Sequence, residues 1–140
     1  GSGTGIAPFL SILQDFEVWQ RFERIVLVYS ARTFAELAYQ PLIRGLAELE
    51  YLAEFADKLI YLPVVTREQA PDCLNARITD LLDSGELEQA AGLELTPEHS
   101  RVMICGNPQM IDDIRQRLKA RGLNLSLTRR PGQVAVENYW

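Results

Sequence analysis

The sequence predicts an α/β protein: a doubly wound, parallel, five-stranded sheet with helices on both faces. Short apolar runs typical of buried strands alternate with segments of helical periodicity. The 140 residues are 47% hydrophobic and 24% charged, which suits one globular domain with a substantial core. A glycine-rich turn at residues 1–5 should follow a strand, and no strand precedes it here. We therefore expect that the first strand is truncated.

The first half of the chain contains two expected helices and two expected strands. Pro8 suits the first position of a helix, whose apolar face is Phe9, Ile12, Leu13 and Phe16. Residues 25–29 form a continuous apolar run, typical of a strand covered on both sides. Pro41 opens the second helix, with an apolar stripe of Leu42, Leu46, Leu49 and Ala53. Residues 59–65 form the next strand, and Pro63, which lacks a backbone donor, predicts a place at or near a sheet edge.

The second half continues the alternation. A short helix is expected around residues 78–82, and residues 86–98 have the composition of a polar connection. The run 102–105 predicts another buried strand. A helix over residues 110–121 and a last strand over residues 123–127 should follow, with a tail to the end of the chain.

Unusual residues follow the strands at their carboxyl ends. Parallel strands end at a common edge, and open α/β sheets bind ligands there. Glycine-rich turns let the backbone approach a phosphate closely, with helix N–H groups directed at its charge. This pattern favours a dinucleotide site. Its residues are Gly3, Thr4, Gly5, Ala31, Arg32, Thr66, Arg67, Cys105, Gly106, Asn107 and Pro108.

Composition argues against several other classes of function. The net charge of −5 disfavours a nucleic-acid partner, and no apolar run approaches the roughly 20 residues that cross a bilayer. Two well-separated cysteines, Cys73 and Cys105, indicate a reduced, cytoplasmic protein. The single histidine, His99, lies in a polar stretch, so we expect neither a metal site nor a hydrolase triad. Apart from Lys58 and Lys119, the 14 basic residues are arginines, which suit phosphate.

The ordered motifs of the chain resemble the NADP(H)-binding half of bacterial ferredoxin/flavodoxin–NADP⁺ reductases. These motifs are G-T-G-I-A-P-F-L-S-I-L, V-L-V-Y-S-A-R, V-V-T-R-E, C-G-N-P-Q-M and V-E-N-Y-W. The resemblance implies hydride transfer between NADPH and FAD, and electron exchange with ferredoxin or flavodoxin. It also implies an upstream β-barrel that holds most of the FAD. Residues 1–140 would then be the NADP(H)-binding domain of a cytoplasmic monomer, inactive when isolated.

The resemblance also implies roles for individual residues. The turn Gly3, Thr4 and Gly5 would lie beside the pyrophosphate and nicotinamide, with Thr4 also near the flavin. The arginines would receive the adenosine 2′-phosphate and its ribose; they are Arg32, Arg67 and Arg77. The alternative for Arg32 and Arg67 is a solvated strand end, which their shared place at the ligand-binding edge disfavours, whereas Arg77 could as well be an ordinary surface arginine at a helix start.

The remaining roles concern the nicotinamide end. The segment Cys105, Gly106, Asn107 and Pro108 would lie under the nicotinamide end, where Cys105 would help place the ring for hydride transfer. Glu137 would be the tail carboxylate near the nicotinamide. The terminal pair Tyr139 and Trp140 would stack on the flavin where the nicotinamide must enter. From the residues alone, Cys105 is a small buried residue at a strand end. The pair Arg129 and Arg130 is interpreted as a surface feature that favours an acidic carrier protein or flavin phosphates.

Two alternatives stay open. One is the NAD(P)H-binding reductase domain of an oxygenase or a diaphorase, which the terminal Tyr139 and Trp140 disfavour. The other is a non-catalytic flavodoxin-like or receiver-type domain. A receiver needs clustered acidic residues at its strand ends, and the sequence places none there.

Overall fold

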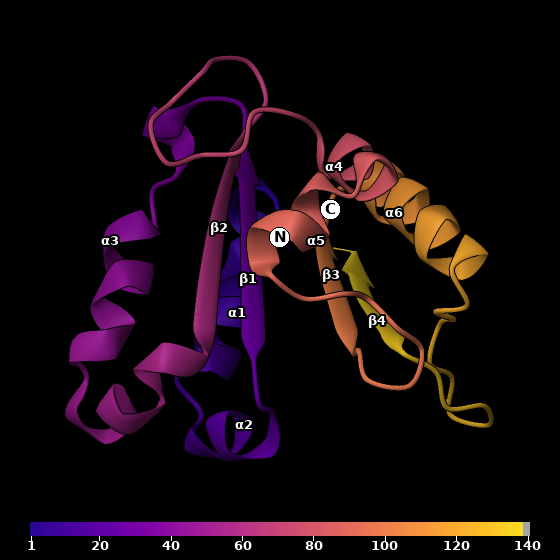
Figure 1. Cartoon of the computed structure of the whole chain (residues 1–140), viewed down its shortest axis with the longest axis horizontal. Coiled ribbons are helices and arrows are strands. Elements are labelled where there is room, and N and C mark those ends of the chain that lie inside the picture. The colour runs from indigo at the N-terminus through magenta and orange to yellow at the C-terminus, as the bar shows by residue number, and fades with distance from the viewer. Residues whose placement is uncertain (139–140) are drawn as a thin grey trace.

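The structure is a computed structural model, and it describes residues 1–138, apart from the side chains of residues 47 and 138. Its four strands are all parallel (Figure 1). Strand β1 (Ile25–Ala31) pairs with β2 (Leu59–Val65), and β3 (Val102–Gly106) pairs with β4 (Val134–Asn138). The predicted α/β class with parallel strands and helices is confirmed.

Helices and 3₁₀ turns connect the strands. The α-helices are α1 (Ala7–Leu13), α2 (Phe16–Arg21), α3 (Gln40–Arg44), α4 (Ile78–Ser84), α5 (Glu86–Ala91) and α6 (Pro108–Ala120). The 3₁₀ segments are η1 (Gly3–Ile6), η2 (Phe34–Glu36), η3 (Gly45–Glu48) and η4 (Glu50–Lys58). No helix within residues 1–138 has the length and apolar character that a membrane crossing requires.

Two hydrophobic clusters lie on opposite faces of the strands. Successive strand residues point to opposite faces, so Leu27 and Tyr29 of β1 pack with α1, α2 and α3. Val64 of β2 and Ile104 of β3 pack instead with α4, α5 and α6. Figure 1 shows the helices distributed around the strands in this way.

Two predicted helices are shorter than the apolar pattern suggested. The first ends at Leu13, because Asp15 accepts a hydrogen bond from the Glu17 N–H and starts α2. Phe16 therefore begins a new helix and is exposed instead of facing the core. The second predicted helix is α3 followed by η3 and η4. The buried residues Ile43, Leu46 and Leu52 are separated by multiples of three positions, which matches the three-residue period of the 3₁₀ segments that follow α3. The buried face therefore starts at Ile43, and Leu42, on the expected stripe, is exposed.

The predicted last strand over residues 123–127 is wrong. Leu125 and Leu127 form only single bridges, to Val134 and Arg130, as the chain folds back on itself. The strand that pairs with β3 is β4, which lies in the predicted tail. The predicted polar connection 86–98 also contains a helix, α5, with Leu87 buried. Pro63 does lie near an edge: within the described residues β1 is the one named strand that pairs with β2, and the other side of β2 carries only an isolated bridge to Leu74.

Gly1 and Ser2 occupy one strand position between β1 and β3. The amino group of Gly1 donates to the Val28 carbonyl at 2.8 Å, and the Gly1 carbonyl accepts from the Ser30 N–H at 2.9 Å. On the other side, the Ser2 N–H donates to the Cys105 carbonyl at 3.3 Å. Burial lowers the pKa of the Gly1 amino group to about 5. Two residues thus join the two strand pairs.

Candidate functional site

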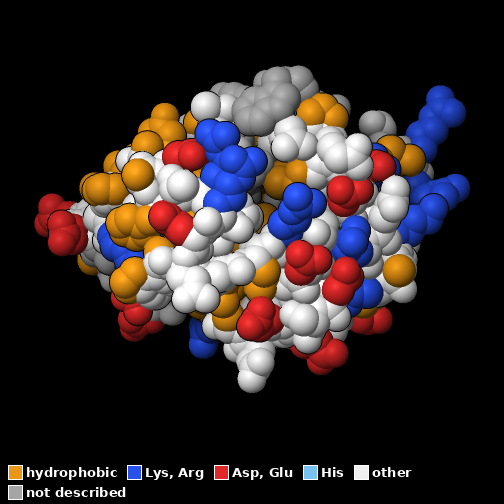
Figure 2. Space-filling view, turned by 90° about the horizontal axis from the view of Figure 1, so that it is seen from above, with side chains coloured by type: hydrophobic (Ala, Val, Ile, Leu, Met, Phe, Trp, Pro, Cys, Tyr) orange, Lys and Arg blue, Asp and Glu red, His pale blue; other side chains and the backbone are white. Residues whose placement is uncertain are grey.

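The residues predicted to form a site gather at the carboxyl edge of the strands. Figure 2 looks onto this edge and shows basic side chains spread across it, with acidic side chains beside them. The predicted residues form two groups. The first, called the arginine corner, consists of Arg32 and Arg67, which follow β1 and β2. The second lies at the ends of β3 and β4, beside η1, and includes Cys105 and Glu137.

In the arginine corner, the backbone pairing of β1 with β2 continues beyond both strands. The Thr66 N–H donates to the Ala31 carbonyl at 3.0 Å, and the Arg67 N–H donates to the Arg32 carbonyl at 2.9 Å. Arg32 and Arg67 are therefore neighbours, and both are exposed. Two guanidinium groups at one sheet edge suit a phosphate dianion, which accepts paired hydrogen bonds from arginine.

Arg77 reaches the same edge by a different path. Leu74 runs parallel beside Val64, with hydrogen bonds to the Pro63 carbonyl and from the Val65 N–H. A segment parallel to β2 heads toward the same carboxyl edge, and Arg77 follows three residues later, as the exposed N-cap of α4. The structure thus places Arg77 on the segment next to β2.

Two acidic residues that sequence reasoning missed lie in the arginine corner. Glu36 forms an ion pair with the Arg32 guanidinium at 3.2 Å. Glu68 accepts a hydrogen bond from the Phe34 N–H at 2.6 Å. Both partners of the ion pair are exposed, so the pair is weak. The i,i+4 spacing of Arg32 and Glu36 was the signal available in the sequence.

The glycine turn lies directly against the end of β3. A Cβ added to Gly5 would lie 2.7 Å from the Cys105 carbonyl oxygen, so only glycine fits. Gly3 has a φ of 54°, in the left-handed region that glycine tolerates. Thr4, between them, is exposed at the edge. The turn therefore brings Thr4 beside the carboxyl end of β3.

Cys105 and Glu137 are cross-strand neighbours on β3 and β4. Burial, and secondarily the charge of Glu137, raises the pKa of the Cys105 thiol. The thiol is therefore protonated at neutral pH. A buried neutral thiol is a poor nucleophile, so this group suits positioning rather than covalent chemistry.

Ser2 is a further residue that the sequence did not indicate. Its hydroxyl oxygen is buried and has no hydrogen-bond partner among the described residues. It lies against Gly106, where an added Cβ would come within 2.5 Å of this oxygen and of Met110 Cε. A larger residue at position 106 would therefore displace the side chains of Ser2 and Met110, and an unsatisfied hydroxyl lies at the end of β3.

Asn107 and Pro108 have structural roles at the start of α6. The Asn107 Oδ1 accepts from the Met110 N–H at 2.8 Å, and Pro108 takes the first helical position. Arg129 and Arg130 precede β4, at the opposite edge from the site. Tyr139 and Trp140 lie outside the described residues. Residues 1–138 contain no group of three or more His, Cys, Asp or Glu side chains that could hold a metal ion.

Known proteins match this chain over nearly its whole length. The family model described as the oxidoreductase NAD-binding domain matches residues 1–116. A ferredoxin–NADP reductase of Azotobacter vinelandii is 44% identical over 140 residues, covering 97% of this chain and 54% of the relative. A flavodoxin/ferredoxin–NADP reductase of Escherichia coli K12 is 45% identical, and the match covers 99% of this chain and 54% of the relative. The resemblance carried by the motifs is thus confirmed.

A solved structure agrees with these relatives. The crystal structure of a ferredoxin NADP⁺ reductase from Neisseria gonorrhoeae, with bound FAD and NADP, superimposes with a TM-score of 0.89 at 39% identity. The superposition covers 99% of this chain and 54% of the reductase chain. The chain therefore spans about half the length of the relatives it matches.

Proposed function

Because the chain belongs to the family of oxidoreductase NAD-binding domains, we propose that it is the NADP(H)-binding domain of a ferredoxin/flavodoxin–NADP⁺ reductase. One observation carries the proposal: a single sheet edge holds the neighbouring Arg32 and Arg67 and also the contact of Gly5 with Cys105. The guanidinium groups of Arg32 and Arg67 suit the 2′-phosphate that distinguishes NADP from NAD. The glycine turn that contacts Cys105 suits the close approach of the pyrophosphate and the nicotinamide ring.

In the proposed complex, Arg32 and Arg67 bind the 2′-phosphate, and Arg77 approaches from the segment beside β2. Arg32 must then exchange the Glu36 carboxylate for the phosphate. This exchange is favourable because an exposed ion pair contributes little, whereas a dianion attracts several guanidinium groups at once.

At the other end, Thr4, Cys105 and Glu137 surround the nicotinamide. When bound, FAD supplies the redox chemistry by exchanging hydride with NADPH. The chain contributes position: Gly5 lets the turn lie on β3, and the neutral Cys105 thiol fills the space beneath the ring. Tyr139 and Trp140 are proposed to cover the flavin.

The proposal includes a fifth strand between β1 and β3, supplied from upstream of Gly1. The hydrogen bonds of Gly1 and Ser2 on both sides already follow a parallel strand at this position. Val26 and Met103 lie on strands β1 and β3, whose facing sides pair with no strand of residues 1–138. They are 37% and 53% exposed although both are apolar. A further apolar strand would cover them and complete the predicted five-stranded sheet.

The remaining parts of the proposal concern the whole protein. An upstream β-barrel would hold most of the FAD, and the electron partner would be ferredoxin or flavodoxin, as the names of the relatives suggest. Both cysteines are free, which supports a reducing, cytoplasmic location. We propose a monomer with neither a nucleic-acid nor a membrane partner.

Calorimetric titration of the 140-residue chain with 2′,5′-ADP and with 5′-ADP tests the proposal. The expected result is saturable binding of 2′,5′-ADP that is about tenfold tighter than binding of 5′-ADP, since only the former carries the 2′-phosphate. Equal affinity for the two nucleotides would rule out the arginine corner as a 2′-phosphate site.

A further inference from the structure

Strands β3 and β4 have one covered face and one open face. The hydrophobic cluster that packs with α4, α5 and α6 includes Ile104 of β3 and Val134 of β4. Successive strand residues point to opposite faces, so the cross-strand pair Met103 and Ala135 points away from this cluster. Both residues are exposed. The cluster under α1, α2 and α3 contains none of the described residues of β3 or β4.

Helix α1 borders the open face and leaves a hollow of about 90 Å³ between helix and strands. Phe9 and Ile12 line this hollow from α1, and Met103 and Ala135 line it from the strands. Glu137 lies at its carboxyl end. Because Glu137 belongs to the group proposed to surround the nicotinamide, the open face leads directly to that end of the candidate site.

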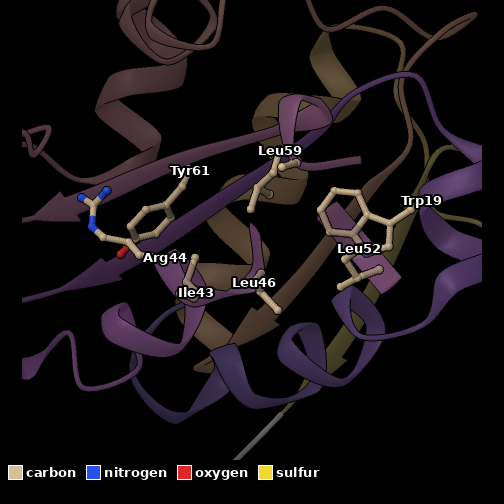
Figure 3. A pocket seen from close by; sticks show the side chains of 8 residues that line it. Trp19, Ile43, Arg44, Leu46, Leu52, Leu59 and Tyr61 are labelled. Carbon is tan, nitrogen blue, oxygen red and sulfur yellow. The ribbon is translucent and has the colours of Figure 1, made fainter. Parts of the chain in front are cut away.

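A larger hollow, of about 230 Å³, lies beside α3 and β2 (Figure 3). Its lining includes Ile43, Leu46 and Leu52, which are between 1% and 2% exposed and belong to the packed core. This hollow therefore has no room for a partner. The open face of β3 and β4, in contrast, is accessible from outside.

An open apolar face is unusual here, because parallel sheets occur almost only with both faces covered. The proposed fifth strand does not provide the cover. It would lie beside β3 in the plane of the sheet and would cover Met103 from the side, whereas Ala135 lies one strand further away, on β4. Since no helix of residues 1–138 buries Met103 or Ala135, the expected cover comes from outside these residues.

We propose that the open face, defined as Phe9, Ile12, Met103 and Ala135, packs against the domain that holds FAD. This inference rests on the proposed function, from which it takes its occupant. Hydride transfer requires the nicotinamide and the flavin to lie about 3–3.5 Å apart. The domain that holds the flavin must therefore approach the chain at Glu137, where the open face begins.

The size of the relatives and the chemistry of the face support this occupant. The match covers 54% of the Azotobacter vinelandii reductase and 54% of the Neisseria gonorrhoeae reductase, so each contains a further part of domain size. Permanent interfaces are more hydrophobic than transient ones and resemble a core cut in half. The exposed Phe16 and Phe22 precede β1, at the edge far from the nicotinamide, and cannot serve the same contact.

The test joins the part of the Neisseria gonorrhoeae reductase that this chain does not match ahead of Gly1, because that reductase binds FAD. Ala135→Cys places a thiol on the open face, and Cys73→Ser removes the half-buried natural thiol. Cys105 is buried. A maleimide should modify Ala135→Cys at least about tenfold more slowly in the joined protein than in the 140-residue chain, because an interface core excludes solvent.

Ala120→Cys is the matched control. Ala120 is an exposed alanine at the end of α6, which packs on the covered face. Its variant should react at the same rate in both proteins. A joined protein that does not hold one FAD by its flavin absorbance, or one that holds FAD while Ala135→Cys reacts as fast as in the isolated chain, would overturn the proposal. The 2′,5′-ADP titration does not involve this face, so failure of the arginine corner is a separate result.

Discussion

Gly5 and Cys105 are in such close contact that a Cβ on residue 5 would lie 2.7 Å from the Cys105 carbonyl oxygen and 2.9 Å from its carbonyl carbon. The contact is between two backbones, so no side-chain rotation relieves it. It joins the glycine turn to the end of β3, and in the proposed complex it sets the position of the turn beside the nucleotide.

Gly5→Ala is accordingly expected to destabilise the fold. The added methyl group must displace the backbone of either η1 or β3, at a cost of about 1–3 kcal/mol. Urea denaturation followed by circular dichroism measures the change. The control is Gly45→Ala, because a Cβ there meets nothing within 4 Å and its φ of −79° suits alanine. If both variants unfold at the wild-type midpoint, the Gly5 contact has no energetic importance.

Glu36→Gln is expected to increase affinity for NADP⁺. The substitution frees the Arg32 guanidinium from its carboxylate partner and removes a negative charge near the incoming phosphate. A gain of about two- to fivefold at low ionic strength, shrinking as salt is added, corresponds to an exposed pair. Calorimetry at two salt concentrations checks this. The matched substitution Glu48→Gln, outside the arginine corner, should change nothing, and a loss of affinity in Glu36→Gln would contradict the assignment of Arg32 to the phosphate.

The stability of the 140-residue chain should fall as the pH falls from 8 to 5. The Gly1 amino group has a pKa of about 5 when folded, against 8.0 as its ordinary value. Between these values the unfolded chain binds a proton that the folded chain does not, so acidification favours unfolding, by up to about 4 kcal/mol. Denaturant titrations across this pH window measure the slope.

Acetylation of the amino terminus provides the control for that slope. The acetylated chain keeps an N–H for the Val28 carbonyl but has no amino group to protonate. Its stability should be nearly constant between pH 8 and 5. A similar loss of stability in both forms would mean that other groups cause the pH dependence.

Asn107 variants distinguish a helix cap from a nucleotide ligand. Asn107→Ala removes the acceptor for the Met110 N–H and should cost about 1 kcal/mol of stability. Asn107→Asp keeps the cap and should restore stability. If Asn107 only caps α6, both variants should bind NADP⁺ with the wild-type affinity, apart from any repulsion by the aspartate. Thermal denaturation and calorimetry on the same samples provide both readouts.

The sequence predicted correctly the strands whose apolar pattern fits only a buried strand. Strands β1, β2 and β3 are continuous apolar runs, because a hydrophobic cluster lies on each face of the strands. Residues 123–127 and β4 are both short and alternating, and composition cannot decide which of them pairs with β3. In the structure β4 pairs with β3, and residues 123–127 fold back beside the start of β4. A Cβ added to Gly132 would lie 2.4 Å from the Asn124 carbonyl oxygen, so this fold-back suits glycine at position 132.

For the candidate site, position along the chain was more informative than residue type. Arg32, Arg67 and Cys105 were predictable because each follows a strand that was itself predictable. Ser2 carried no signal, since only the close packing against Gly106 reveals its buried hydroxyl. Glu36 was missed because an acidic residue four positions after an arginine usually marks a solvated surface.

Selection of NADP(H) by its 2′-phosphate is the main property that we assign to the arginine corner. The decisive measurement is the pair of dissociation constants for NADP⁺ and NAD⁺, in the wild-type chain and in the double variant Arg32→Gln/Arg67→Gln. We expect the wild-type chain to prefer NADP⁺ by about tenfold or more, and the double variant to lose this preference while its NAD⁺ affinity stays within about twofold. Equal wild-type affinities, or a double variant that weakens both cofactors alike, would contradict this assignment.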